Sequence, residues 1–378
     1  MKSYKAVVVL ILGIFVFISA NCNTQPAQFD NDEIPFKDII NTVVSSNAYV
    51  DSFLVYVEEG NRGLSPYIFL GEFSQQKCSI LLRFTNVPDS VIVQSATLTL
   101  DPFYVYGSPG AGFTAAIHEI ASAWDENEIP DISYDPVAAA SFVVDPSADV
   151  MDSVVIPDEI VQGWVDARSD TMLSNYGILI TFSAADFAKQ YLAQTGVTLT
   201  LRYSEGETEE TLTHRPTADT YIVEGQKDFY PDFLVSNFGC HRIIMRFGFP
   251  AIPEKVVINY AELVMKLDTD NSFIGPEEMQ GFSVYRIDSD SWQQDELTYS
   301  ENDAVVGMLD FNTDVPEARF VITQFVQGWI SDAAENRGIL LTSLRENESF
   351  SRYTFAFDTA DSLMQPVLVV HYSLFNPF

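Results

Sequence analysis

Ile160-Val-Gln-Gly-Trp164 recurs as Phe325-Val-Gln-Gly-Trp329, and this repeated stretch decides the fold. The two remaining tryptophans, Trp124 and Trp292, also form a matched pair, because each follows an isoleucine closely and precedes a cluster of acidic residues. Every tryptophan of the chain therefore belongs to one of two pairs. The long spacing between the copies indicates tandem domains and not a solenoid of short repeats.

The match extends along both copies. Leu81-Leu-Arg83-Phe84 corresponds to Ile244-Met-Arg246-Phe247, and Tyr49-Val-Asp51 corresponds to the Ala218-Asp-Thr-Tyr-Ile222 start of the second copy. A stretch without apolar side chains, Glu205-Gly-Glu-Thr-Glu-Glu-Thr211, lies between the copies. We therefore expect a first domain at residues 48–204, an acidic linker at 205–216 and a second domain at 217–378.

Short alternating runs such as Thr97-Leu-Thr-Leu100 put one face inward and one outward, which predicts β-strands. The repeated tryptophan stretch instead has apolar residues at helical spacing, and this predicts one short helix per copy. Glycine inside both helices, Gly163 and Gly328, suggests close packing against a strand. The expected class is mainly β, with two tandem β-sandwich domains of jelly-roll type and one short packing helix in each.

The N-terminus reads as a sorting signal. Lys2 and Lys5 precede an apolar run from Ala6 to Ala20, which is shorter than a membrane-spanning helix needs. The run ends in Ile18-Ser-Ala-Asn-Cys22, which resembles a bacterial lipoprotein signal and implies acylation at Cys22 after removal of residues 1–21. Ordinary secretion with cleavage elsewhere is the alternative. Residues 22–47 read as a tether, so we expect a cell-envelope protein held at the outer membrane or cell surface by lipid only.

Composition limits the partners. The chain has 53 acidic and 20 basic residues, a formal net charge of −33. Such a surface repels nucleic acid and anionic membranes, and it disfavours acidic polysaccharides unless a divalent cation bridges the two anions. Cys78 and Cys240 lie in different copies without ligand-spaced partners, so we expect buried free thiols.

The ordered set of motifs, found in both copies, resembles the DNRLRE domain, also called disaggregatase-related. The resemblance implies a secreted or surface β-sandwich that binds carbohydrate in some members, including acidic glycans such as alginate. The family's arginine and tryptophan positions map to residues that we interpret as structural: Arg83, Arg246, Trp124, Trp292, Trp164 and Trp329. An arginine in an apolar strand needs a carboxylate or several carbonyls, and Asp51 and Asp219 are the candidate partners.

Two segments could bind ligands. Asp101-Pro-Phe-Tyr-Val-Tyr-Gly107 carries Phe103, Tyr104 and Tyr106, which are candidate sugar-contacting rings, although a strand continuing the core is the alternative. Asp268, Asp270 and Asn271 begin like a calcium loop, so Ca²⁺ is the candidate cofactor. The loop lacks the glycine and glutamate of an EF-hand, and a solvated acidic loop is the alternative.

Motifs of catalysis are missing from the sequence. It contains no Gly-x-Ser-x-Gly, no His-Glu-x-x-His and no phosphate-binding loop, and its histidines occupy unrelated positions in the two copies. We therefore expect a non-catalytic protein that binds extracellular polysaccharide or mediates adhesion. The alternative is a structural or assembly protein that binds other envelope proteins and no glycan.

Overall fold

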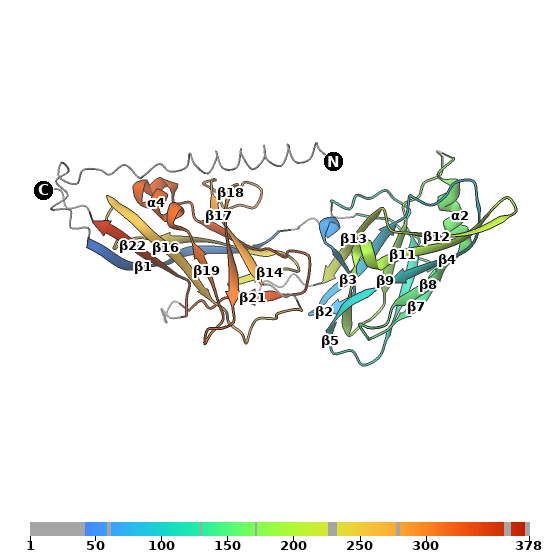
Figure 1. Ribbon diagram of the computed structural model, residues 1–378, viewed down its shortest axis with the longest axis horizontal. Helices are drawn as coiled ribbons and strands as arrows, with labels where there is room; N and C mark the ends of the chain where they lie inside the picture. Colours follow the sequence, from blue (N-terminus) through green and yellow to red (C-terminus); the bar gives the residue numbers. More distant parts are fainter. Residues whose placement is uncertain are drawn as a thin grey trace, which may run out of the picture.

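The computed structural model describes residues 42–58, 62–128, 131–170, 172–225, 233–276, 280–358 and 364–374. The predicted signal peptide, Cys22 and tether residues 22–41 lie outside this range, and the predicted end of the tether at 47 is wrong, because residues 42–47 belong to a β-strand that begins at Thr42. The expected mainly β fold with few helices is confirmed. Figure 1 shows two β-rich bodies arranged end to end. We call residues 62–225 the N unit, and residues 42–58 together with 233–374 the C unit.

The N unit is a sandwich of two antiparallel sheets. One sheet has the order β5-β10-β2-β3-β9-β6-β7 with β13 also paired to β3, and the other has the order β12-β11-β4-β8. Apolar side chains from both sheets fill one core. The strands are β2 (Tyr67–Phe73), β3 (Gln76–Arg83), β4 (Ile92–Leu100), β5 (Pro102–Gly107), β6 (Phe113–Glu119), β7 (Ala140–Val144), β8 (Asp152–Ile156), β9 (Ile178–Phe182), β10 (Phe187–Leu192), β11 (Val197–Glu205), β12 (Thr208–His214) and β13 (Ala218–Gly225).

The C unit closes its sheet into a barrel with the order β1-β15-β20-β17-β18-β19-β16-β22, and a small β14-β21 pair accompanies it. Closure leaves this sheet without free edges. The strands are β1 (Thr42–Val57), β14 (Leu234–Ser236), β15 (His241–Gly248), β16 (Val256–Lys266), β17 (Gly281–Ile287), β18 (Tyr299–Asp310), β19 (Glu317–Val321), β20 (Ile339–Ser343), β21 (Arg352–Thr354) and β22 (Val367–Leu374).

The first strands of the two copies are exchanged. Strand β1, expected to open the first domain, pairs with β15 and β22 of the C unit, and Phe53 lies opposite Met245. Strand β13, expected to open the second domain, pairs with β3 of the N unit, and Thr220 lies opposite Leu81. The domain boundaries at 48 and 217 are therefore wrong. Both copies offer an equivalent strand edge, so local sequence does not determine which edge a first strand uses.

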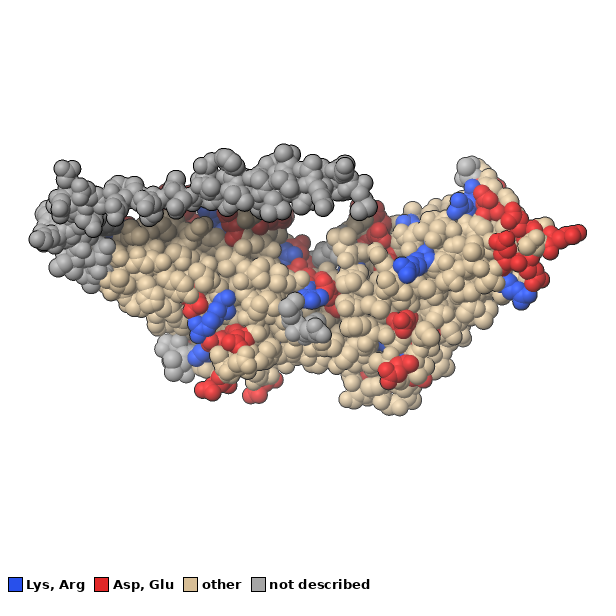
Figure 2. Space-filling view, in the orientation of Figure 1, with Lys and Arg blue, Asp and Glu red and all other residues tan. Residues whose placement is uncertain are grey.

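The predicted acidic linker is also corrected. Residues 205–216 contain β12, which pairs antiparallel with β11 through a tight turn at Gly206, where φ is +63°. Threonines alternating with glutamates allow an exposed strand here, since the other face needs no apolar cover. Acidic side chains gather at this far end of the N unit (Figure 2). The exposed glutamates of the hairpin are Glu205, Glu207, Glu209 and Glu210.

One helix packs on each unit, as expected. Helices α2 (Asp158–Asp166) and α4 (Thr323–Ser331) bury matching apolar stripes, which include Trp164 and Trp329. The glutamine of each repeat is bound alike: Gln162 Oε1 accepts a hydrogen bond from Val93 N, and Gln327 Oε1 accepts one from Ile258 N, both at 2.9 Å. A one-turn helix α3 (Ala193–Gly196) and the 3₁₀ turns η2 (Arg62–Leu64) and η3 (Ala333–Glu335) complete the helical elements described.

The glycines inside α2 and α4 do not serve the predicted close packing. A Cβ added at Gly163 or at Gly328 meets no atom within 4 Å outside its own helix backbone and chain neighbours. The expectation of tight helix–strand contact at these positions is therefore wrong. Buried tryptophan, not glycine, makes the contact between each helix and its sheet.

Candidate functional site

The units are docked to each other through aromatic side chains. Phe350 and Phe238, both from the C unit, belong to the apolar core of the N unit. Their rings stack with centroids 4.1 Å apart, and Phe350 lies 5.2 Å from Phe69 of the N unit. A shared core of this kind fixes the relative position of the two units.

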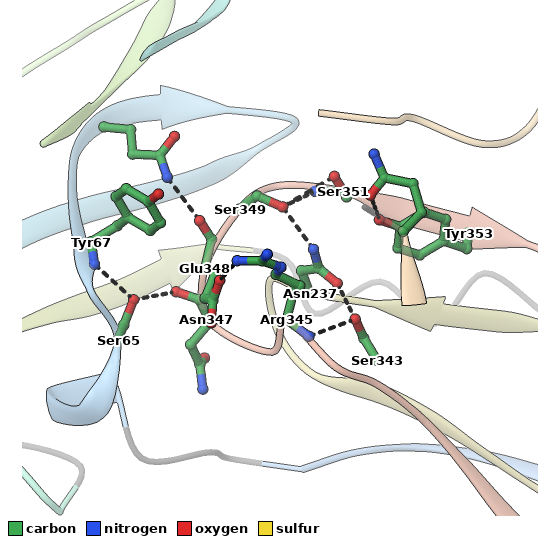
Figure 3. Close-up of polar contacts among 12 residues, drawn as sticks. Ser65, Tyr67, Asn237, Ser343, Arg345, Asn347, Glu348, Ser349, Ser351 and Tyr353 are labelled. Carbon is green, nitrogen blue, oxygen red and sulfur yellow. Dashed lines mark hydrogen bonds and ion pairs between the residues drawn. The ribbon is translucent and has the colours of Figure 1, made fainter. Parts of the chain in front are cut away.

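Polar contacts from one loop of the C unit reinforce this docking (Figure 3). The carbonyl oxygen of Asn347 accepts hydrogen bonds from Ser65 Oγ at 2.8 Å and Tyr221 Oη at 2.9 Å. Gln190 Nε2 donates to the carbonyl oxygen of Glu348 at 2.8 Å. Because these partners lie in the N unit, the loop joins the two units into one body.

Each strand arginine packs on the first tryptophan of its own copy. The Arg83 guanidinium lies 4.9 Å from the Trp124 ring and donates to the Trp124 carbonyl at 3.1 Å. The Arg246 guanidinium lies 5.8 Å from the Trp292 ring. Cation–π contact of this kind contributes about 0.5–1 kcal/mol at exposed sites. The structural interpretation of these four residues fits this geometry.

The expected carboxylate partners behave differently. Asp51 lies 3.3 Å from Arg246 Nε, and both side chains are nearly half exposed. Asp219 makes no ion pair among the described residues and instead lies beside Glu126, whose carboxylate accepts from the Asp219 backbone N–H at 3.1 Å. Burial, with a smaller contribution from the Glu126 charge, raises the pKa of Asp219 to about 6. Only one of the two suggested partners therefore meets an arginine.

The predicted aromatic segment lies on β5, an edge strand of the N unit. Tyr106 is 1% exposed, and its hydroxyl donates to Gln190 Oε1 at 3.0 Å, so it is a core residue and not a ligand-binding candidate. Tyr104 is partly buried beside it, with ring centroids 4.8 Å apart. Phe103 is 46% exposed and packs against Tyr67 at 4.9 Å. Alternation put Tyr104 and Tyr106 on one face, and that face turns inward.

The predicted calcium loop forms a turn that satisfies its own polar groups. Asp268 Oδ1 accepts from the backbone N–H of Asp270 at 3.1 Å, and Asp268 Oδ2 accepts from the Asn271 side-chain amide at 2.8 Å. Across the described ranges, no group of three or more His, Cys, Asp or Glu side chains is placed to hold a metal ion. Calcium binding here stays a prediction.

The cysteines of the two copies are buried free thiols, as predicted. Burial raises the pKa of the Cys78 thiol, so its thiolate is disfavoured. Of the helices that the structure describes, none has the length and apolar character to cross a membrane.

Sequence analysis missed a buried charged cluster in the N unit. Lys189 Nζ lies 2.8 Å from Asp152 Oδ2, and both side chains are at most 1% exposed. Tyr191 Oη donates to the same oxygen at 2.7 Å. Along β10, Lys189 shares a face with Phe187 and Tyr191, and that period of two could have placed it inside.

Sequence analysis also missed a cavity of about 240 Å³ where the units meet. Both units line it, through the β2–β3 hairpin, the end of β1, the start of β15 and the loop around Asn347. Its lining includes Arg62, His241, Phe73, Phe238, Phe273 and Phe350. No sequence signal could have found it, because its walls come from segments that only the docking of the units brings together.

Comparison with protein-family models, with curated proteins and with solved structures gave no match, so the likeness to DNRLRE domains rests on the motifs of the sequence.

Proposed function

We propose that this protein is a non-catalytic binding protein of the bacterial cell envelope, held by lipid at Cys22, whose N unit contacts extracellular carbohydrate. The observation that carries the proposal is the exposed ring of Phe103 on the edge strand β5. A sugar presents C–H groups on its ring faces, and an open aromatic ring offers them a complementary apolar surface.

The surroundings of Phe103 support this role. Tyr67 packs against it at 4.9 Å and enlarges the aromatic surface. Tyr67 also lies beside Ser65 and the Asn347–Glu348 segment (Figure 3), where the Arg345 and Glu348 side chains pair at 2.8 Å. Sugar hydroxyls need donors and acceptors near the stacking surface, and the partly exposed Arg345 guanidinium and Glu348 carboxylate supply one of each.

The net charge narrows the ligand class. Because the chain has a formal net charge of −33, it favours a neutral polysaccharide over an acidic one, unless divalent cations bridge the protein and the polysaccharide. Binding of a neutral polymer would depend weakly on salt, because no ion pairs would form at the contact.

The test compares two matched substitutions. Affinity electrophoresis of the purified protein through gels containing neutral or acidic polysaccharides, with and without Ca²⁺, measures retention. We expect Phe103→Ala to weaken binding at least tenfold, the effect of losing about 1.4 kcal/mol. Phe311→Ala is the control, because Phe311 is similarly exposed, at 52%, but lies on the C unit.

Two outcomes contradict the proposal. One is that no polysaccharide retards the unsubstituted protein, which would leave the assembly role as the better explanation. The other is equal retention of the Phe103→Ala and Phe311→Ala variants. Labelling of cells with a clickable fatty acid tests the anchor separately, and Cys22→Ala should abolish incorporation.

A further inference from the structure

The cavity between the units contains a buried polar atom that has no partner in the part of the chain that the structure describes. His241 is 9% exposed and lines the cavity, and its Nε2 has no hydrogen-bond partner among the described residues. A buried imidazole nitrogen left unpaired costs about 1–3 kcal/mol. A ligand that bonds to Nε2 would remove this cost.

The position of the hydrogen on the other ring nitrogen, Nδ1, decides whether His241 Nε2 donates or accepts a hydrogen bond. Ser236 Oγ donates its only proton to the Phe238 carbonyl at 2.7 Å, so it can only accept from His241 Nδ1, which lies 2.9 Å away. Nδ1 therefore carries the hydrogen, and Nε2 of the neutral ring is an acceptor. Burial lowers the pKa of His241, with a smaller effect from the Arg352 charge, which favours that neutral ring. The matching ligand group is a hydroxyl or another donor.

Arg62 places a positive charge at the same cavity. Its guanidinium lies 5.8 Å from the Tyr221 ring, and no carboxylate of the described residues forms an ion pair with it. Among the described residues of the lining, Glu58 is the only acidic one, and it already lies 3.5 Å from Arg242. In a protein with 53 acidic residues, an arginine left without a carboxylate is available to a bound anion.

The backbone around the cavity is in unusual conformations. Five non-glycine residues of the described chain have positive φ, and four of them line or border this cavity: Ser74 (51°), Gln75 (66°), Cys240 (43°) and Asn347 (64°). Ser74 and Gln75 are the two central residues of the β2–β3 hairpin turn, since Phe73 pairs directly with Gln76, and a turn of this kind needs positive φ at both. The backbone conformation here shapes the wall of the cavity, and the case for a ligand rests on Arg62 and His241.

We propose that the cavity binds a small carboxylate with an apolar body and a hydroxyl group, with Arg62 holding the carboxylate and His241 Nε2 accepting from the hydroxyl. Phe73, Phe238, Phe273 and Phe350 enclose the apolar body. This site is separate from Phe103 and does not depend on polysaccharide binding. The volume of about 240 Å³ suits a ligand smaller than most drug-sized molecules.

Isothermal titration calorimetry of the purified full chain with three related probes tests the assignment. The probes are 4-hydroxyphenylacetate, phenylacetate without the hydroxyl, and 4-hydroxyphenylacetamide without the charge; 3-hydroxyoctanoate gives an aliphatic counterpart. We expect a hydroxy acid to bind best, and loss of either group to weaken binding about tenfold.

Variants assign each group to its residue. Arg62→Gln should remove the preference for acid over amide, while Arg62→Lys should retain part of it. His241→Asn keeps a donor toward Ser236 but lacks Nε2, so it should remove the preference for the hydroxylated probe. Arg246→Gln is the matched control, because Arg246 lies on the outer surface of the C unit and is 45% exposed.

The proposal is overturned if neither hydroxy acid binds at millimolar concentration, or if Arg62→Gln and Arg246→Gln bind the acid equally well. Melting curves of each variant verify folding. If Arg62→Gln does not fold, the preference of the conservative Arg62→Lys variant for acid over amide is compared with that of the unsubstituted protein instead. Polysaccharide retention by these variants should be unchanged, so failure here leaves the carbohydrate proposal standing.

Discussion

Replacing Lys189 with methionine should cost more stability than any other single charge removal in the N unit. Lys189 Nζ, with the side chain fully buried, contacts Asp152 Oδ2 at 2.8 Å, the Val150 carbonyl at 2.9 Å and the Asp145 carbonyl at 3.0 Å. Three acceptors match the three protons of an ammonium group. Lys189 thereby ties the 145–152 segment to strand β10.

The magnitude follows from what the substitution leaves behind. Methionine fills a similar volume, so cavity formation adds little. Asp152 keeps its bonds from Tyr191 Oη at 2.7 Å and the Asp145 backbone N–H at 2.8 Å but loses its counter-charge at 1% exposure. Breaking one side of a buried ion pair costs about 3–5 kcal/mol. Arg202→Met is the surface control: Arg202 and Glu209 are more than half exposed, so its cost should stay below about 1 kcal/mol.

Urea unfolding followed by circular dichroism measures the difference. We expect a lower midpoint with an unchanged slope. Adding Asp152→Asn to Lys189→Met should recover part of the loss, because the uncompensated charge disappears, and the double-mutant cycle gives the coupling between the pair. A cost of Lys189→Met no larger than that of Arg202→Met would refute the argument that this pair is buried and charged.

Two further predictions concern the helices and a buried acid. Gly163→Ala and Gly328→Ala should each stabilise the protein by about 0.5–1 kcal/mol, since both sites are open and helical. Gly177→Ala should destabilise the protein, because φ at this residue is +82° and the new Cβ would lie 2.0 Å from the Leu82 carbonyl oxygen. Thermal melts of the three variants measure these changes. Asp219, with its pKa raised to about 6 in the folded protein, binds its proton more tightly there than in the unfolded chain. The protonated Asp219 carboxyl therefore adds its full contribution to the free energy of unfolding below about pH 4. That contribution, roughly 2–3 kcal/mol, is lost as the pH rises through 6. Asp219→Asn should flatten that part of the stability–pH curve, and an unchanged slope would contradict the shift.

Much of the local structure follows from the sequence. Alternation of apolar residues predicts the strands, and the repeated Val-Gln-Gly-Trp stretch predicts helices α2 and α4 with their buried faces. These predictions of strands and helices are correct because a short amphipathic pattern determines which face of an element is buried, and this does not depend on which element packs against that face. The same reasoning fails for 205–216, where threonine and glutamate form an exposed strand that reads as a linker.

The sequence by itself determined the repeated motifs, the mainly β class, the acidic composition and the burial of both cysteines and of Trp124, Trp164 and Trp329, because each of these depends on composition or on spacing within one element. Only the tertiary structure decided that β1 and β13 exchange places, that Tyr106 turns inward, and that Arg62 and His241 share one cavity. The physical reason is that the two copies share their strand motifs, so β1 and β13 each find an antiparallel partner that carries the same Arg-Phe motif at its end, β15 or β3. The choice between those partners, and every site made by joining the copies, is settled by packing across hundreds of residues and not by any local pattern.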